Sequence, residues 1–333
     1  MHAHQTVCSS LALKTGVLAL GVLLLAGCAG ATAEAREPAT ETTSIEVTDN
    51  NGTQTIALPL TSVVATDNRT FETLADWGVE LTAAAVSLMP DTISYTTDEK
   101  IIDLGSHREP DLEAVVAVAP QLIINGQRFV DHHDDFVSLA PDAVVLELDP
   151  RDGEPLDEAL KRQTTVLGEI FGKQAEAKKL NDALDAAIER AKAAYDATDT
   201  VMAVNTSGGE IGYLAPVVGR TLGPVFDLLD LTPALEVTDA TDDHQGDDIS
   251  VEAIAASNPT WILVMDRDAA ISADDPAYVA GAEILEGSEA LAGVTAVKED
   301  NIVYMPADTY TNEGIQTYTE FLNAFADALE AAA

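Results

Sequence analysis

Short apolar runs alternate with amphipathic stretches along most of the chain. Apolar runs cover residues 62–65, 83–86 and 122–124, while amphipathic stretches cover residues 71–77 and 112–118. Buried strands of a parallel sheet are short apolar runs, and the helices that cover such a sheet carry one apolar face. The alternation therefore predicts βα units and an α/β lobe.

A second series of apolar runs predicts a second α/β lobe. It begins at residues 201–204 and continues through residues 261–264 to residues 302–304. Between the two series, a stretch with few turn signals carries apolar residues at Leu180, Leu184, Ile188, Ala191 and Tyr195. Their spacings of four, four, three and four place them on one face of a helix of about 33 Å. We expect this helix, within residues 173–198, to connect a lobe at 56–172 to a lobe at 199–333.

An internal repeat supports the two-lobed arrangement. Residues 112–124 align without gaps on residues 251–263, and both copies consist of a helix pattern, a proline and a buried strand pattern. The same offset places Arg128 opposite Arg267, just beyond the two strands. Ligands of open α/β sheets bind at the carboxyl ends of the strands, so we expect both arginines to face one cleft. The alternative is that both are ordinary surface arginines.

The N-terminal segment resembles a lipoprotein signal peptide. Lys14 precedes an apolar stretch that is short for a membrane span, and the sequence Leu-Ala-Gly-Cys ends at Cys28. Cleavage before Cys28 would leave its thiol available for a lipid anchor, although an ordinary signal with an accidental cysteine is the alternative. We expect residues 1–27 to be the signal and residues 28–55 to be a flexible tether.

Composition and charge narrow the class of protein. The 333 residues are 47% hydrophobic, enough for two compact cores, and the formal charge is −40. Removing residues 1–27, whose only charged side chain is Lys14, changes that charge to −41. Such acidity argues against affinity for nucleic acid, and it is also a common adaptation for solubility. Cys8 lies in the leader, so the mature chain has no intramolecular disulfide.

The sequence contains no motif of a common enzyme. It has no glycine-rich phosphate loop, no Gly-x-Ser-x-Gly elbow and no Cys/His metal spacing. His132 and His133 lie beside several aspartates, which would suit a metal site, but a solvated acidic loop leading into a helix explains them better, because zinc sites need ligands held by a second shell. We therefore expect a binding protein without catalysis.

Two further side chains have chemistry that a binding site could use. His244 lies in a polar loop ahead of the second repeat, and Tyr310 lies in the polar segment 308–314 after the last apolar run. A tyrosine phenolate is a hard oxygen donor that suits Fe(III). Position alone does not distinguish either residue from an ordinary surface side chain.

From residue 56 onward, most sharply after Ala215, the chain resembles the siderophore-binding lipoproteins of ABC iron importers. These are solute-binding proteins with a helical backbone between the lobes, and the similarity is to the branch that takes catecholates of the enterobactin and petrobactin type. The motifs that carry it are His244, Asn258-Pro259, Asp266-Arg267, and Pro306 followed by Tyr310.

The resemblance implies a ligand site and partners. His244 and Tyr310 would complete the iron coordination of a tetradentate bis-catecholate, and Arg128, Arg220 and Arg267 would hold the anionic complex. Relative to the family pattern, Gln127 is inserted before Arg128, and Arg220 lies one residue further from its proline. The implied protein has no intrinsic cofactor, is a monomer on the outer face of the cell membrane, and delivers its ligand to a permease. Its candidate docking residues for that permease are Glu109, Glu113 and Glu252.

Two alternatives to this reading remain open at this point. The same scaffold could carry haem, cobalamin or a bare metal ion, since haem also uses Tyr and His ligands. A surface lipoprotein that adheres to a protein or a wall polymer is the other possibility, although only 5% of the residues are aromatic and no aromatic patch is evident.

Overall fold

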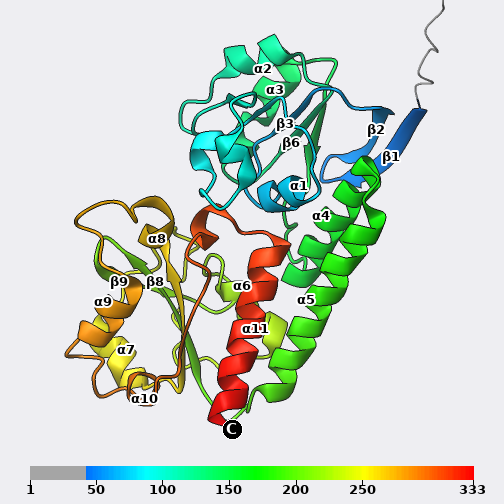
Figure 1. Cartoon of the computed structure of the whole chain (residues 1–333). Helices are drawn as coiled ribbons and strands as arrows, with labels where there is room; N and C mark the ends of the chain where they lie inside the picture. The colour runs from blue at the N-terminus through cyan, green and yellow to red at the C-terminus, as the bar shows by residue number, and fades with distance from the viewer. Residues whose placement is uncertain (1–42) are drawn as a thin grey trace, which may run out of the picture. The chain divides into compact units, whose positions relative to one another are not determined.

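The computed structural model describes residues 43–333 (Figure 1). The predicted signal peptide, Cys28 and the first part of the predicted tether lie outside the described residues. Within residues 43–333, no helix combines the length and the apolar character that crossing a membrane requires.

The end of the predicted tether is an ordered β-hairpin. Strands β1 (Thr43–Asp49) and β2 (Gly52–Leu58) pair antiparallel across a tight turn, so the prediction of a flexible tether over residues 43–55 was wrong. The sequence Asn-Gly in the turn favours a hairpin, and Val47 and Ile56 bury their side chains in the first core. The turn also binds the first lobe, because the Asn50 backbone N–H donates to the carbonyl of Glu147 at 2.9 Å.

The first lobe is built on a fully parallel sheet of five strands. Its order is β5-β4-β3-β6-β7, and each neighbouring pair is parallel. The strands are β3 (Val63–Ala65), β4 (Ala83–Ala84), β5 (Ile102–Asp103), β6 (Leu122–Asn125) and β7 (Val144–Glu147). The α-helices of this lobe are α1 (Phe71–Asp76), α2 (Leu112–Val118) and α3 (His133–Leu139), and its 3₁₀ turns are η1 (Val86–Leu88), η2 (Ser94–Thr97) and η3 (Gln127–His132).

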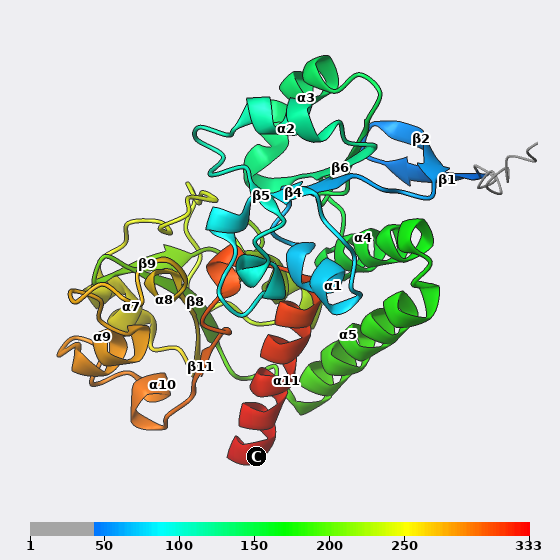
Figure 2. The ribbon, with the colours of Figure 1, turned by 45° about the horizontal axis from the view of Figure 1, so that its top comes forward.

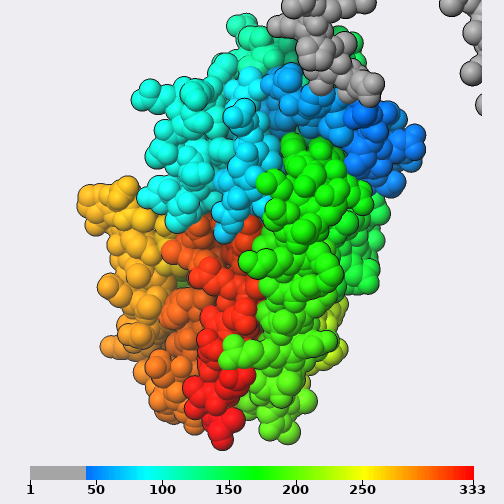
Figure 3. All heavy atoms as spheres, turned by 45° about the vertical axis from the view of Figure 1, so that its right-hand side comes forward, coloured from blue at the N-terminus to red at the C-terminus, as the bar shows by residue number. Residues whose placement is uncertain are grey.

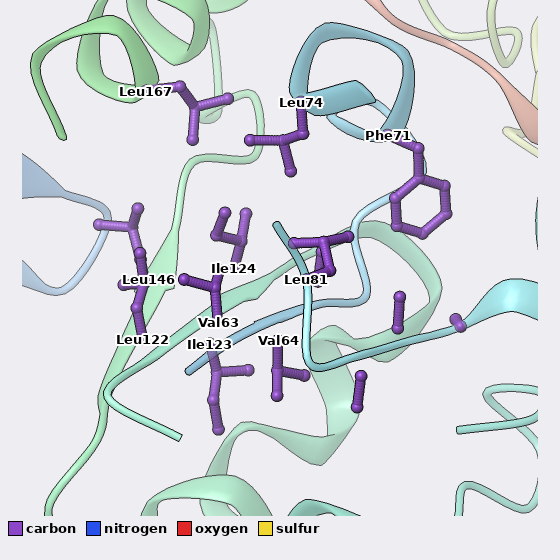
Figure 4. Packing of buried hydrophobic residues seen from close by; sticks show 14 of the residues in the cluster. Val63, Val64, Phe71, Leu74, Leu81, Leu122, Ile123, Ile124, Leu146 and Leu167 are labelled. Carbon is purple, nitrogen blue, oxygen red and sulfur yellow. The ribbon is translucent and has the colours of Figure 1, made fainter. Parts of the chain in front are cut away.

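Strands β3, β4 and β6 of this sheet are buried on both faces, which explains their apolar sequences, whereas the edge strand β5 is exposed. Val63, Val64 and the residues of β6 pack against side chains from the surrounding helices (Figure 4). Leu74 of α1 covers one part of this core, and Leu167 from a later helix covers another. A sheet covered on both sides is the environment in which parallel strands occur.

The second lobe contains a mixed sheet with the order β11-β10-β8-β9. Strands β8 (Val201–Ser207), β10 (Trp261–Asp266) and β11 (Ile302–Tyr304) are parallel, whereas β9 (Glu210–Leu214) runs antiparallel to β8. The expected α/β fold of two lobes is confirmed, but this sheet is not parallel throughout, because the two glycines between β8 and β9 form a tight hairpin. The helices of this lobe are α6 (Gly223–Leu229), α7 (Val251–Ser257), α8 (Arg267–Ile271), α9 (Gly281–Gly287), α10 (Thr295–Lys298) and the 3₁₀ turn η4 (Thr309–Thr311).

Alternate residues of β8 enter two different cores. Val201 and Ala203 pack with Phe325 of the last helix, α11 (Ile315–Ala332), while Met202 and Val204 pack on the other face of the sheet. This alternation follows from the two-residue period of a strand.

Two long helices, rather than one, contact the cores of both lobes. The expected helix is α5 (Gln174–Ala194), and α4 (Leu156–Phe171) lies beside it (Figure 2). In α5, Ala177 belongs to the first core and Leu184 to the second; in α4, Leu167 and Leu160 divide in the same way. Figure 3 shows this green pair next to α11 in red. A rigid helical pair therefore links the two lobes.

The internal repeat corresponds to two matching structural units. Helices α2 and α7 each contain seven residues, and each ends in a left-handed residue before a proline, Ala119 in the first and Asn258 in the second. Strands β6 and β10 follow. The two units therefore bring the chain to the carboxyl edge of each sheet in the same way.

Candidate functional site

Three guanidinium groups surround the ring of Tyr310. The Cζ atoms of Arg128, Arg267 and Arg220 lie 4.4, 4.9 and 5.1 Å from the centroid of that ring. Each distance is within the range of a cation–π contact. Tyr310 itself is only 6% exposed. The structure thus brings together four of the five residues that the sequence assigned to ligand and iron binding.

Arg128 reaches this cluster from the first lobe. It follows β6 and Gly126, and the intervening Gln127 has a left-handed backbone with φ of 52°. The Gln127 N–H donates to Asp149 Oδ1 at 2.7 Å, which holds that conformation. Arg128 Nη2 then donates to the carbonyl of Tyr310 at 2.8 Å, across the two lobes. The inserted residue therefore does not move Arg128 out of the site.

Arg267 reaches the cluster from the equivalent position of the second lobe. It is the first residue of α8, directly after β10. Its Nη1 donates to Ser207 Oγ at 3.0 Å and lies 3.2 Å from Asp268 Oδ1. The repeat that aligned Arg128 with Arg267 therefore corresponds to two arginines that meet at one tyrosine.

Arg220 is carried by a constrained loop between β9 and α6. Val217 and Thr221 in this loop have φ values of 68° and 66°, a left-handed backbone that is unfavourable for β-branched side chains. Backbone hydrogen bonds over-determine the loop, including Val217 N–H to the Gly223 carbonyl at 2.9 Å and Gly219 N–H to the Ala215 carbonyl at 2.8 Å. A strained but tightly held loop fixes the direction in which Arg220 points.

Glu313 is the buried counter-charge of Arg220. Its side chain is 4% exposed, lies 3.3 Å from Arg220 Nη2 and accepts from Thr221 Oγ1 at 2.6 Å. Burial alone would raise the pKa of Glu313, but the charges of Arg220 and Arg69 and the Thr221 bond outweigh burial and lower that pKa. Burial alone would likewise lower the pKa of Arg220, and Glu313 reverses the shift. Both groups are therefore charged at neutral pH.

The pKa of Arg128 is lowered, whereas that of Arg220 is raised. Burial lowers the pKa of Arg128, and the positive charges of Arg220 and Arg267 act in the same direction, although an arginine still remains protonated. Like charges held this close repel one another, so an anionic ligand with aromatic faces would relieve an unfavourable interaction in the protein itself.

A pair of carboxylates lies beneath the loop that carries Arg128. Asp67 is fully buried and accepts from Gln163 Nε2 at 2.9 Å, while Asp149 accepts from Arg69 Nη1 at 2.8 Å. Burial, followed by the charge of Asp149, raises the pKa of Asp67 to about 7. Asp149, which also accepts from the Gln127 N–H, supports that backbone and, through it, Arg128.

His244 lies apart from the arginine cluster in the contacts that the structure defines. Its side chain is 46% exposed, in a polar loop, and among residues 43–333 no hydrogen bond joins it to Tyr310. Its carbonyl accepts from Asn205 Nδ2 at 3.0 Å, which ties the loop to β8, two residues before the Ser207 that contacts Arg267. The role of His244 as an iron ligand remains a prediction.

His132 and His133 point to different partners. His132 Nε2 lies 2.8 Å from the carbonyl of His107, and His133 Nδ1 lies 2.9 Å from Glu147 Oε1. Within the described part of the chain, no group of three or more His, Cys, Asp or Glu side chains is arranged to hold a metal ion.

The lobes touch mainly through the segment that carries Tyr310. Asn312 Nδ2 donates to Glu72 Oε2 at 2.8 Å, Gln316 Oε1 accepts from Thr73 at 2.8 Å, and Gln127 Nε2 donates to Glu313 Oε2 at 3.3 Å. Movement of one lobe relative to the other would therefore act directly on the arginine site.

A cavity of about 1060 Å³ lies beside this segment, between residues of both lobes. No Lys, Arg or His lines it. Its lining includes the carboxylates of Glu72, Asp76, Asp91, Asp274, Asp275, Asp308 and Glu320. An anion is repelled there, so we place the ligand site at the arginine cluster despite the size of this cavity.

Sequence reasoning missed Glu313 and the carboxylates beneath Gly126. Glu313 was part of the polar segment 308–314, and a glutamate three residues after a candidate tyrosine was the available signal. Asp67 and Asp149 are separated by a large sequence distance from Arg128, so only the fold reveals their contact.

The comparisons with known proteins show the family and the fold. The profile of the periplasmic binding protein family matches residues 63–309. The petrobactin-binding protein YclQ of Bacillus subtilis is 26% identical over 287 residues, which are 85% of this chain and 86% of YclQ.

Two solved structures share the fold. The periplasmic catecholate-siderophore binding protein VctP of Vibrio cholerae superposes with a TM-score of 0.73 at 21% identity, covering 87% of this chain and 100% of VctP. The siderophore-binding protein BauB, solved with ferric iron and two acinetobactin molecules, gives a TM-score of 0.73 at 22% identity, with coverages of 86% and 99%.

Two α/β lobes linked by long helices form the architecture of the periplasmic solute-binding proteins. Because the family profile covers most of the chain, this protein belongs to the periplasmic binding protein family. Members of this family bind substrates rather than transform them, which confirms the expectation of a binding protein without catalysis.

Proposed function

We propose that this protein captures an Fe(III) siderophore of the catecholate class outside the cytoplasmic membrane and delivers it to an ABC importer. The observation that carries the proposal is the convergence of Arg128, Arg220 and Arg267, from both lobes, on the ring of Tyr310. YclQ, VctP and BauB support it, because each is named for or solved with a siderophore.

The chemistry of the cluster suits a ferric catecholate. Such a complex is anionic and presents flat aromatic rings, and guanidinium groups bind anions through paired hydrogen bonds and aromatic faces through cation–π contact. The formal charge of the whole chain is −40, so its far field repels anions. A local group of three arginines is therefore needed to hold this ligand.

Tyr310 and His244 are our proposed iron ligands. Tyr310 lies at the centre of the arginines, so an anionic complex held by them would place its metal close to the phenol oxygen. His244 belongs to the exposed loop that Asn205 ties to the C-terminal half of β8, in the lobe that also carries Tyr310. A tetradentate bis-catecholate leaves two positions of an octahedral Fe(III) open, and these two side chains would fill them.

The remaining parts of the proposal concern the membrane. Cys28, as the lipidated residue of the mature chain, would hold a monomer at the outer face of the cytoplasmic membrane. Glu109, Glu113 and Glu252 are exposed, and the latter two occupy equivalent first turns of α2 and α7. They are our candidates for docking to arginines of the permease. Uptake measured after charge reversal at Glu113 and Glu252, with ligand affinity unchanged, would test this pair.

The ligand assignment is tested by fluorescence titration of residues 28–333 with an Fe(III) bis-catecholate. Arg128→Gln, Arg220→Gln and Arg267→Gln are compared with Arg190→Gln, because Arg190 makes its ion pairs with Asp327 and Glu330 on α11. Loss of a charged hydrogen bond predicts affinity about 10- to 100-fold weaker for each cluster variant and unchanged affinity for Arg190→Gln.

Haem and cobalamin are titrated in parallel. Binding of either one, without binding of the ferric catecholate, would keep the transport role but replace the ligand. Equal weakening by Arg190→Gln and the cluster variants would show that the arginines act only through overall charge.

A further inference from the structure

Two carboxylates lie directly on the guanidiniums of the arginine cluster. Glu313 contacts Arg220 at 3.3 Å, and Asp268 contacts Arg267 at 3.2 Å. Arg128 has no carboxylate within ion-pair distance among residues 43–333, and it donates instead to the carbonyl of Tyr310. Three guanidiniums with two bound carboxylates leave one net positive charge around the Tyr310 ring.

The next groups outward do not change this balance. Arg69 faces Glu313 but is paired with Asp149 at 2.8 Å, so the two charges offset each other. Asp67 also faces Arg69, but burial raises its pKa to about 7, so this carboxyl is mostly uncharged below neutral pH. Glu313 is also fixed in place, because its carboxylate accepts from Thr221 in the second lobe and from Gln127 in the first. Its charge is therefore a permanent feature of the site.

Ferric catecholates differ in charge according to the number of catechol groups. Fe(III) with two catecholates carries a single negative charge, which becomes two when a tyrosine phenolate joins the metal. Fe(III) with three catecholates carries three negative charges and needs no protein ligand. A site with one net positive charge compensates the first complex far better than the second.

We propose that Glu313, together with Asp268, determines the charge specificity of this site and selects ferric bis-catecholates over ferric tris-catecholates. This inference rests on the proposed function. The two carboxylates lower the positive potential that three arginines would otherwise present, so a triply charged complex leaves uncompensated negative charge in a buried environment.

The test measures two dissociation constants for each variant. The probes are Fe(III) with a linear bis(2,3-dihydroxybenzoyl) ligand and Fe(III) with a tris(2,3-dihydroxybenzoyl) ligand. Glu313→Gln keeps the size of the side chain and removes its charge. Asp268→Asn does the same at a less buried position, and Glu320→Gln is the matched control, an exposed glutamate on α11.

We expect the wild type to prefer the bis-catecholate. Glu313→Gln and Asp268→Asn should each shift the ratio of dissociation constants about tenfold toward the tris-catecholate, whereas Glu320→Gln should leave the ratio unchanged. The double variant Arg220→Gln/Glu313→Gln restores one net positive charge, so its ratio should return toward that of the wild type.

The outcomes separate the two proposals. A wild type that binds neither complex would refute the proposed function. A wild type that binds, with the same ratio in Glu313→Gln and Glu320→Gln, would refute the charge-specificity inference alone. If Glu313→Gln does not fold, Asp268→Asn decides by the same criterion.

Discussion

The most specific structural prediction concerns Gly126, the residue between β6 and the loop of Arg128. Its backbone is extended, with φ of 168°, so alanine meets no backbone penalty there. The side chain is the obstacle. A Cβ at this position would lie 2.7 Å from Asp67 Oδ2 and 2.8 Å from Asp149 Oδ2.

The cost follows from how firmly those carboxylates are held. Each would have to move by roughly half an ångström or more to reach an ordinary contact distance. Asp67 is held by Gln163 and by the N–H of Arg69 at 3.0 Å, and Asp149 is held by Arg69 and Gln127. Overpacking of this kind costs about 1–3 kcal/mol. Displacement of Asp149 would also release Gln127, so we expect the affinity for an Fe(III) bis-catecholate to fall about tenfold.

Urea unfolding and ligand titration of Gly126→Ala measure both effects. Gly287→Ala is the control, because a Cβ on Gly287, at the end of α9, would contact nothing within 4 Å. We expect a loss of stability and of affinity in Gly126→Ala only. Equal unfolding free energies and equal affinities in the two variants would refute the packing argument.

Asp67, Gly314 and the acidic surface each provide a further test. Burial and Asp149 raise the pKa of Asp67 to about 7 from its ordinary 3.8, so the folded protein holds this proton more tightly than the unfolded chain. The resulting stability is present near pH 4 and is lost as the pH rises through 7. Asp67→Asn should therefore reduce the change of the thermal unfolding midpoint between pH 4 and 8, and parallel midpoint-against-pH curves for the two proteins would contradict this. A Cβ on Gly314 would lie 2.8 Å from the carbonyl of Arg69 in the other lobe. Gly314→Ala should therefore weaken ligand binding and increase the radius of gyration measured by solution scattering, whereas an unchanged radius would show that the lobes do not meet there. Affinity for the bis-catecholate should stay constant or increase as the salt concentration rises to about 0.1 M, because salt screens the repulsion from the acidic surface. A steep loss of affinity would show that the arginines dominate the electrostatic potential that the ligand meets.

The sequence predicted most of the fold because buried parallel strands have a distinctive apolar pattern. The runs at Val63, Leu122, Val201 and Trp261 are all strands, and the two arginines that the internal repeat paired, Arg128 and Arg267, both lie over the ring of Tyr310. Periodicity failed where elements are short or half-exposed. The hairpin β1–β2 was missed because only two of its apolar residues, Val47 and Ile56, are well buried, which is a weak signal in a polar segment.

The sequence predicted the arginines and the tyrosine of the candidate site, but not the residues and backbone conformations that position them. Arg220 and Tyr310 came from resemblance to a family, and the structure shows how a left-handed backbone at Thr221 and Val217 directs the arginine. Glu313 could not be distinguished by sequence from the other acidic residues of so acidic a chain. Its significance lies in being buried between two lobes, which depends on long-range contacts.

Tyr310 is proposed to receive the metal of a ferric catecholate that three arginines hold. Resonance Raman and visible spectra of the Fe(III) bis-catecholate complex should be compared between wild type, Tyr310→Phe, His244→Ala and the control Tyr195→Phe. We predict a tyrosinate-to-iron band in the wild type and in Tyr195→Phe that disappears in Tyr310→Phe and shifts in His244→Ala. A wild-type spectrum identical to that of Tyr310→Phe, with the ligand bound, would contradict the account.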